Sequence, residues 1–70
     1  MFNINVCYDD FIDSYPILQY SSPIIPKIGE IIYSPHKGSF MIKDIVYHIS
    51  DDREGFDNKV LFVELKVEER

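Results

Sequence analysis

The chain contains no alanine, threonine or tryptophan, and its 70 residues include a single cysteine, Cys7. One cysteine cannot form an intramolecular disulfide, and one thiol with two histidines does not supply the ligands of a closed structural zinc site. A chain of this length buries only a modest part of its surface, so its stability is expected to be small. Since neither stabilising link is available, self-association as a homodimer is the expectation that remains.

Basic residues are also scarce. Seven Lys and Arg stand against twelve Asp and Glu, which gives a formal net charge of −5. An acidic protein repels phosphate backbones and anionic membrane surfaces, so we expect no binding to nucleic acid or to membranes. The opening residues, MFNINVCYDD, have neither the basic start nor the long apolar stretch of a signal peptide, and no apolar run has the length of a membrane span. We therefore expect a cytoplasmic protein.

No catalytic or cofactor-binding motif is recognisable. The three glycines are isolated, so no phosphate-binding loop is present. Cys7 could act as a nucleophile with His36 or His48 as its base, but no third orienting group accompanies them, and structural roles for the histidines are favoured. Two acidic clusters lack the ligand spacing of a calcium loop, namely Asp9, Asp10 and Asp13, and Asp51, Asp52, Glu54 and Asp57. We expect no enzyme, no cofactor and no metal site.

The residues that are abundant favour strands. Apolar residues make up 46% of the chain and include eleven Ile, five Tyr and five Phe, which pack well on a half-buried pleated surface. Residues 2–8 alternate with the period of a strand that buries one face. Further strands are expected at 17–20, 30–34, 39–50 and 59–68. A short helical turn near 10–15 would end before Pro16. The sequence thus predicts a single mainly-β domain, residues 1–70, built as a small antiparallel meander or SH3-like barrel of four to five strands.

Turn residues and a change of parity add detail to these strands. Gly29 and Gly38 offer positive φ for turns on either side of the third predicted strand. Within 39–50 the apolar residues change from even to odd positions, which predicts a β-bulge near Lys43 and Asp44. The last strand is expected to point four side chains inward, Leu61, Val63, Leu65 and Val67.

Acids and tyrosines lie together in the N-terminal part of the chain. Tyrosine adds a large contact area at a small entropy cost and is enriched at binding hot spots. An equal alternative is that these rings cover the open end of the barrel. On the first interpretation, the acids steer a protein partner by charge and the tyrosines anchor it. The predicted partner-binding residues are Tyr8, Asp9, Asp10, Asp13, Tyr15 and Tyr20.

These features favour a non-enzymatic, small acidic protein-interaction module. Its expected partner is a protein, and a homodimer is a second expectation. Two alternatives from other classes stay open. One is a protein that sequesters a small, nucleotide-like ligand at a dimer interface, and the other is a structural subunit of a larger assembly.

The stretch IPKIGEIIYSPHKGSFMIKDIVYHIS, with KVLFVELKVE after it, resembles short uncharacterised bacterial and phage-encoded β-domains built on a Pro-x-Ile/Val-Gly-Glu turn. The resemblance covers about residues 25–68. The turn is matched by Pro26, Ile28, Gly29 and Glu30, and the strand after the hairpin by Ile45, Val46, Tyr47 and His48. It implies the fold but no particular activity. A small acidic protein encoded by a phage or another mobile element can inhibit a host protein by occupying a basic surface, and this is the role that we expect.

Overall fold

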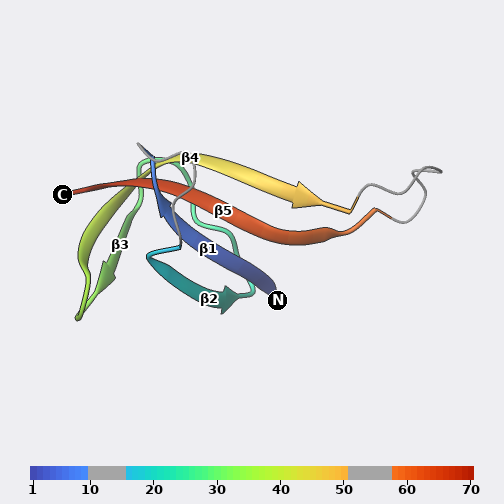
Figure 1. Ribbon diagram of the computed structural model, residues 1–70, viewed down its shortest axis with the longest axis horizontal. Helices are drawn as coiled ribbons and strands as arrows, with labels where there is room; N and C mark the ends of the chain where they lie inside the picture. The colour runs from blue at the N-terminus through green and yellow to red at the C-terminus, as the bar shows by residue number, and fades with distance from the viewer. Residues whose placement is uncertain (10–15, 51–57) are drawn as a thin grey trace.

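The computed structural model describes residues 1–9, 16–50 and 58–70, and these parts of the chain form strands and turns without a helix. The five strands are β1 (Phe2–Tyr8), β2 (Leu18–Ser22), β3 (Ile31–Ser34), β4 (Gly38–Ile49) and β5 (Val60–Glu69), as Figure 1 shows. The predicted mainly-β fold of four to five strands is confirmed, and the structure has five. The helical turn predicted near 10–15 lies outside the described residues.

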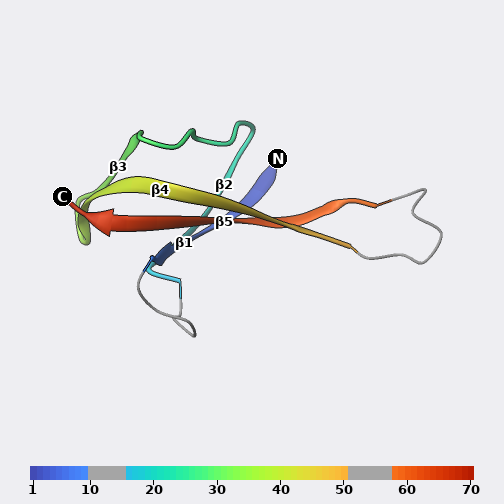
Figure 2. The same cartoon turned by 90° about the horizontal axis from the view of Figure 1, so that it is seen from above.

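All five strands belong to one sheet in the order β2-β1-β5-β4-β3. The sheet curls into a half-barrel, and Figure 2 shows β2 and β3 rising on the same side of the inner strands. Three of the four strand pairs are antiparallel, but β1 runs parallel to β5, with Ile4 opposite Val63 and Val6 opposite Leu65. The sequence predicted antiparallel pairing throughout. The difference arises because an alternating pattern gives the face of a strand and not its direction.

The core lies on the concave face of the half-barrel. Alternate residues of the three inner strands point into it, as the period of two requires. Each of these seven side chains is at most 1% exposed, and full burial of one apolar side chain contributes about 1.5–3 kcal/mol. The core residues are Ile4, Val6, Phe40, Ile42, Val63, Leu65 and Val67. The edge strands add the partly buried Leu18 and Ile32.

The predicted β-bulge is present in β4. The register against β5 shifts between Ile42 and Asp44, and the Asp44 carboxylate accepts a hydrogen bond of 2.9 Å from the backbone N–H of Ile45. The shift lets Ile42 and Ile45 share the concave face although their numbers differ in parity. A second shift, between His48 and Ile49, was not predicted.

Beyond the bulge, the outer ends of β4 and β5 extend past the other strands (Figures 1 and 2). We call these ends, residues 47–49 and 60–62, the arm. Tyr47, Ile49, Val60 and Leu61 are 41% to 55% exposed there. Leu61 was predicted to point inward with three other residues of β5, and those three are buried while Leu61 is 55% exposed. The period of two gives its face, but none of the other described strands covers that face at the arm.

Both predicted glycine turns are confirmed by positive φ angles, 91° at Gly29 and 103° at Gly38. Gly38 starts β4 after a tight turn in which the N–H of Lys37 donates to the carbonyl of Ser34 at 3.2 Å. Gly29 donates its N–H to the carbonyl of Ile42 at 2.8 Å, and Ile42 donates to the carbonyl of Glu30 at 3.0 Å. These bonds fix the start of β3 against the middle of β4.

Candidate functional site

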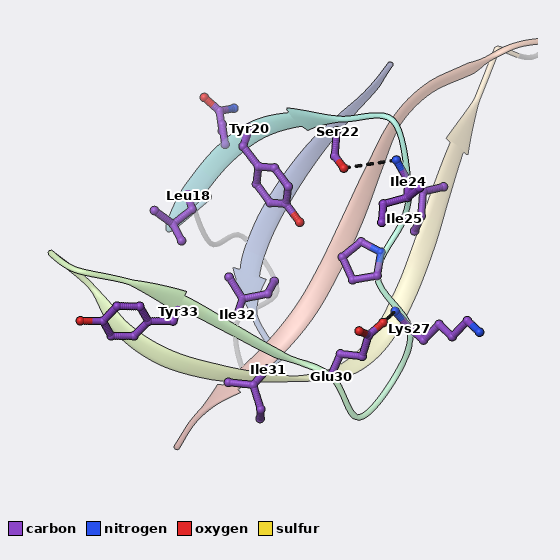
Figure 3. A pocket seen from close by; sticks show the side chains of 12 residues that line it. Leu18, Tyr20, Ser22, Ile24, Ile25, Lys27, Glu30, Ile31, Ile32 and Tyr33 are labelled. Carbon is purple, nitrogen blue, oxygen red and sulfur yellow. Dashed lines mark hydrogen bonds between the residues drawn. The ribbon is translucent and has the colours of Figure 1, made fainter.

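The half-barrel stays open between its two edge strands, β2 and β3, and a groove with a volume of about 800 Å³ lies in this opening. Figure 3 shows the groove from close by. Its walls come from β2, β3 and the connection 23–30 between them. Tyr20 and Ile32 point into the space between the two strands, whereas Ile31 and Tyr33 point away from it.

The sequence builds the groove through strand register and proline. Leu18, Tyr20 and Ser22 share the concave face because they lie opposite Val6, Ile4 and Phe2 of β1. Pro23 and Pro26 favour an extended connection between the edge strands. Two local hydrogen bonds hold that connection: the N–H of Ile24 donates to the Ser22 hydroxyl, and the N–H of Lys27 donates to the Glu30 carboxylate.

The groove is mainly apolar. Among the described residues that line it, Lys27 and Glu30 are the charged ones, one of each sign. Tyr20, at the mouth of the groove, is 36% exposed. Burial, and secondly the negative charge of Glu30, raise the pKa of the Tyr20 phenol. The phenol therefore stays protonated at neutral pH and keeps an O–H group that can donate a hydrogen bond to a bound molecule.

Neither edge strand carries a charged residue. β2 has the sequence LQYSS and β3 the sequence IIYS, while the charged strand residues lie on β4 and β5. Natural proteins commonly protect sheet edges with charges, prolines or bulges, because an unprotected edge can pair with another chain. Three of the residues around the groove have exposed apolar side chains, with Ile24 71%, Ile31 43% and Tyr33 70% exposed.

The structure separates the predicted partner-binding residues. Tyr20 lines the groove, but Tyr8 is half-buried on β1, where its hydroxyl donates to the Glu69 carboxylate at 2.9 Å. This hydrogen bond is the main cause of the raised pKa of Tyr8. The Tyr8 ring also meets the Phe40 ring edge-on at 6.0 Å. Tyr20 lies opposite Ile4, four residues from Tyr8 along β1, a separation of about 13 Å.

Asp9 follows β1 and is exposed, and its backbone N–H donates to the carbonyl of Val67 at 3.0 Å. The other three predicted residues, Asp10, Asp13 and Tyr15, lie outside the described residues. The structure therefore brings one predicted anchor, Tyr20, to the groove. Sequence reasoning missed the groove residues of the connection 23–30, although its two prolines marked that segment as extended.

A charged row crosses the outer face of the sheet. Glu64 accepts hydrogen bonds from Lys66 Nζ at 2.7 Å and from His48 Nε2 at 2.8 Å. The bond from Lys66 is the largest cause that lowers the pKa of Glu64, and burial opposes it. The same bond raises the pKa of Lys66. The His48 ring stacks on Phe62 with the ring centres 4.0 Å apart.

This row gives His48 a structural role on the strand surface. Cys7 is on β1 and lies opposite Lys66 of β5. Strand β5 separates β1 from β4, the strand that carries His48. Lys66 in turn lies opposite Asp44, four residues from His48. His36 lies in the turn between β3 and β4 and is not part of this row. The register of the strands thus keeps His48 away from Cys7, and its partners are Glu64 and Phe62.

Within residues 1–9, 16–50 and 58–70, no group of three His, Cys, Asp or Glu side chains is arranged to hold a metal ion. Of the two acidic clusters in the sequence, only Asp9 belongs to this described part. The same part of the chain contains no helix with the length and apolarity needed to cross a membrane.

Comparison with known proteins gives no relative from which a role could be transferred: no family model, no curated protein and no solved structure matches this chain. The functional argument therefore depends on the groove, the edge strands and the distribution of charge.

Proposed function

We propose that this protein is a small, non-enzymatic protein-interaction module that works in the cytoplasm and contacts its partner at the groove. The observation that carries this proposal is the apolar opening between two uncharged edge strands, with Tyr20 at its mouth. An exposed apolar patch that surrounds an aromatic side chain is typical of a binding hot spot.

Charge supports a basic partner. The described residues carry equal numbers of acidic and basic side chains, while the segments 10–15 and 51–57 carry formal charges of −2 and −3 and so account for the whole net charge of −5. Asp10 and Asp13 belong to the first of these segments, and Asp9 directly precedes it. An uneven charge distribution of this kind speeds encounter with an oppositely charged surface. Inhibition of a host protein by a phage-encoded or mobile-element-encoded protein is the role that we propose.

The test begins with native mass spectrometry of the protein purified from its own host, which identifies a protein bound to it. With that partner purified, Tyr20→Ala is expected to weaken binding by about tenfold or more, because a groove-mouth tyrosine loses its buried contact area. Isothermal titration calorimetry measures the effect. Raising the ionic strength should also slow association with the partner.

Tyr47→Ala is the matched control for Tyr20→Ala, since Tyr47 is a similarly accessible tyrosine, 50% exposed, on the arm. It should leave the affinity within about twofold of wild type. Equal affinity for the Tyr20→Ala variant and wild type, with both folded by circular dichroism, would contradict the proposed contact. Native mass spectra that show no other protein bound after purification from the host would also contradict it.

The groove volume supports a second candidate, sequestration of a small ligand. A volume of about 800 Å³ falls within the usual range for small-molecule sites. Since Lys27 is the single cation among the described lining residues, a nucleoside or another uncharged aromatic molecule fits better than a polyphosphate. A ligand at about 100 times its Kd should stabilise the protein by about 2.7 kcal/mol. This appears as a higher Tm in wild type and a smaller rise in Tyr20→Ala. No rise with any nucleoside would exclude this class of ligand.

A further inference from the structure

The backbone of β3 has hydrogen-bonding groups that point away from β4. The N–H of Ile42 donates to the carbonyl of Glu30, and the register continues with Ile32 opposite Phe40. In an antiparallel pair, bonded and non-bonded positions alternate. The carbonyl of Glu30 and both backbone groups of Ile32 therefore point toward β4, and the groups of Ile31 and Tyr33 point toward the open edge. β3 is the last strand on its side of the sheet that the structure describes.

We propose that two copies of this chain form a dimer by pairing β3 with β3 in antiparallel orientation about a two-fold axis at Ile32. In this register Ile31 lies opposite the partner's Tyr33, and Tyr33 lies opposite the partner's Ile31. The outward N–H and C=O groups of these residues then meet in four hydrogen bonds. A register centred on Ile32 is favoured because it pairs every outward group of β3 within the strand.

The side chains suit the same register. Ile31 and Tyr33 are 43% and 70% exposed and share one face of the strand. Pairing places each isoleucine beside a tyrosine of the other copy, and pairs of aromatic and β-branched residues stabilise antiparallel strands. On the concave face, Ile32 meets the partner's Ile32 at the two-fold axis. Each exposed apolar side chain of this edge thus gains an apolar neighbour.

Charge favours a second copy as the occupant of this edge. β3 itself is uncharged, so two acidic proteins can approach here without close repulsion. Glu30 directly precedes the strand, and Lys37 lies in the turn that follows it. In the register centred on Ile32, Glu30 lies opposite the partner's Ser34, so the paired strands bring no two acidic side chains directly opposite each other.

The dimer goes beyond the proposed function because it uses the outer edge of β3. The partner contact is assigned to Tyr20 on β2, which lies across the groove from β3, and the dimer needs no residue of β2. The two proposals therefore fail separately. Loss of the dimer tests the edge of β3, whereas loss of partner binding in Tyr20→Ala tests the groove.

Sedimentation velocity tests the dimer, with Tyr33→Pro as the decisive variant. The N–H of Tyr33 points away from β4, so proline removes a donor of the dimer and leaves the ladder with β4 intact. Two symmetry-related hydrogen bonds are lost, and the dimer Kd should rise by about 30-fold. Wild type should sediment with twice the chain mass of 8.2 kDa. Tyr47→Lys, an exposed change on the arm, is the control and should remain dimeric.

A double variant, Ile31→Lys with Tyr33→Lys, provides a second test that does not depend on proline. It places like charges opposite each other in the proposed register, so it should be monomeric while its circular dichroism spectrum matches wild type. Amide hydrogen exchange gives a direct readout, because the N–H groups of Ile31 and Tyr33 should become protected as wild-type concentration rises. A wild-type monomer at about 500 µM would overturn the proposal. Oligomers larger than two, unchanged association of both variants, or pairing of β3 only with a different protein would also overturn it.

Discussion

Phe40→Ala is expected to lower the free energy of unfolding by about 3–5 kcal/mol. Phe40 is 1% exposed and is the largest fully buried side chain among the described residues. It lies opposite Ile32 and Glu69, and its ring contacts the Tyr8 ring. Truncation leaves a cavity at the point where β1, β3, β4 and β5 share the core. A domain of this size has a total stability of about 4–10 kcal/mol, so much of the variant should be unfolded. Urea denaturation followed by circular dichroism measures the loss.

Tyr47→Ala is the matched control, because Tyr47 is also an aromatic residue of β4 but is 50% exposed. Its truncation should cost less than about 1 kcal/mol. A comparable loss in both variants would contradict the exposure of the arm. A small loss in Phe40→Ala would contradict the position of the core.

Glu64→Gln is expected to lower the free energy of unfolding by about 1.5–3 kcal/mol at pH 7, because Glu64 accepts charge-assisted hydrogen bonds from both Lys66 and His48. Folding lowers the pKa of Glu64 below its ordinary value of 4.5. Its stabilising effect is therefore complete above that ordinary value and is lost as the pH falls through the lower, folded value. Chemical denaturation of both proteins between about pH 7 and pH 3 should show the difference shrinking.

Glu68→Gln is the control for this experiment. Glu68 lies on the same face of β5, but its ion pair with Lys43 spans 3.6 Å and both side chains are exposed. Such pairs contribute about 0–1 kcal/mol. If Glu64→Gln and Glu68→Gln behave alike, or if the effect of Glu64→Gln does not shrink below the ordinary pKa of 4.5, the charged row on the outer face does not stabilise the sheet.

The sequence predicted the strands well because the alternation of apolar and polar residues, a local pattern, gives the buried face of each strand. The expected ranges 2–8, 39–50 and 59–68 agree within one residue with β1, β4 and β5. The parity change around Lys43 located the bulge in β4. The parallel pairing of β1 with β5 was not predicted, since it joins segments about sixty residues apart and depends on how the whole chain packs.

The candidate site was predicted only in part. The aromatic and acidic composition of the N-terminal region pointed to Tyr20, which lines the groove. The same reasoning treated Tyr8 as equivalent, but Tyr8 packs on Phe40 and bonds to Glu69. Both tyrosines share a concave-face position, so parity does not distinguish them. What distinguishes them is their place in the sheet, because Tyr20 is on an edge strand and Tyr8 is on an inner one.

The position of β5 between β1 and β4 has a consequence for the order of folding. β5 follows the other four described strands in the sequence, yet it joins the β2-β1 hairpin to the β4-β3 hairpin. Until the segment 60–69 has left the ribosome, the nascent chain can form only these two separate hairpins, and isolated hairpins are marginally stable in water. Completion of the core should therefore wait for β5 and be slow, as is usual when the decisive contacts are distant in sequence.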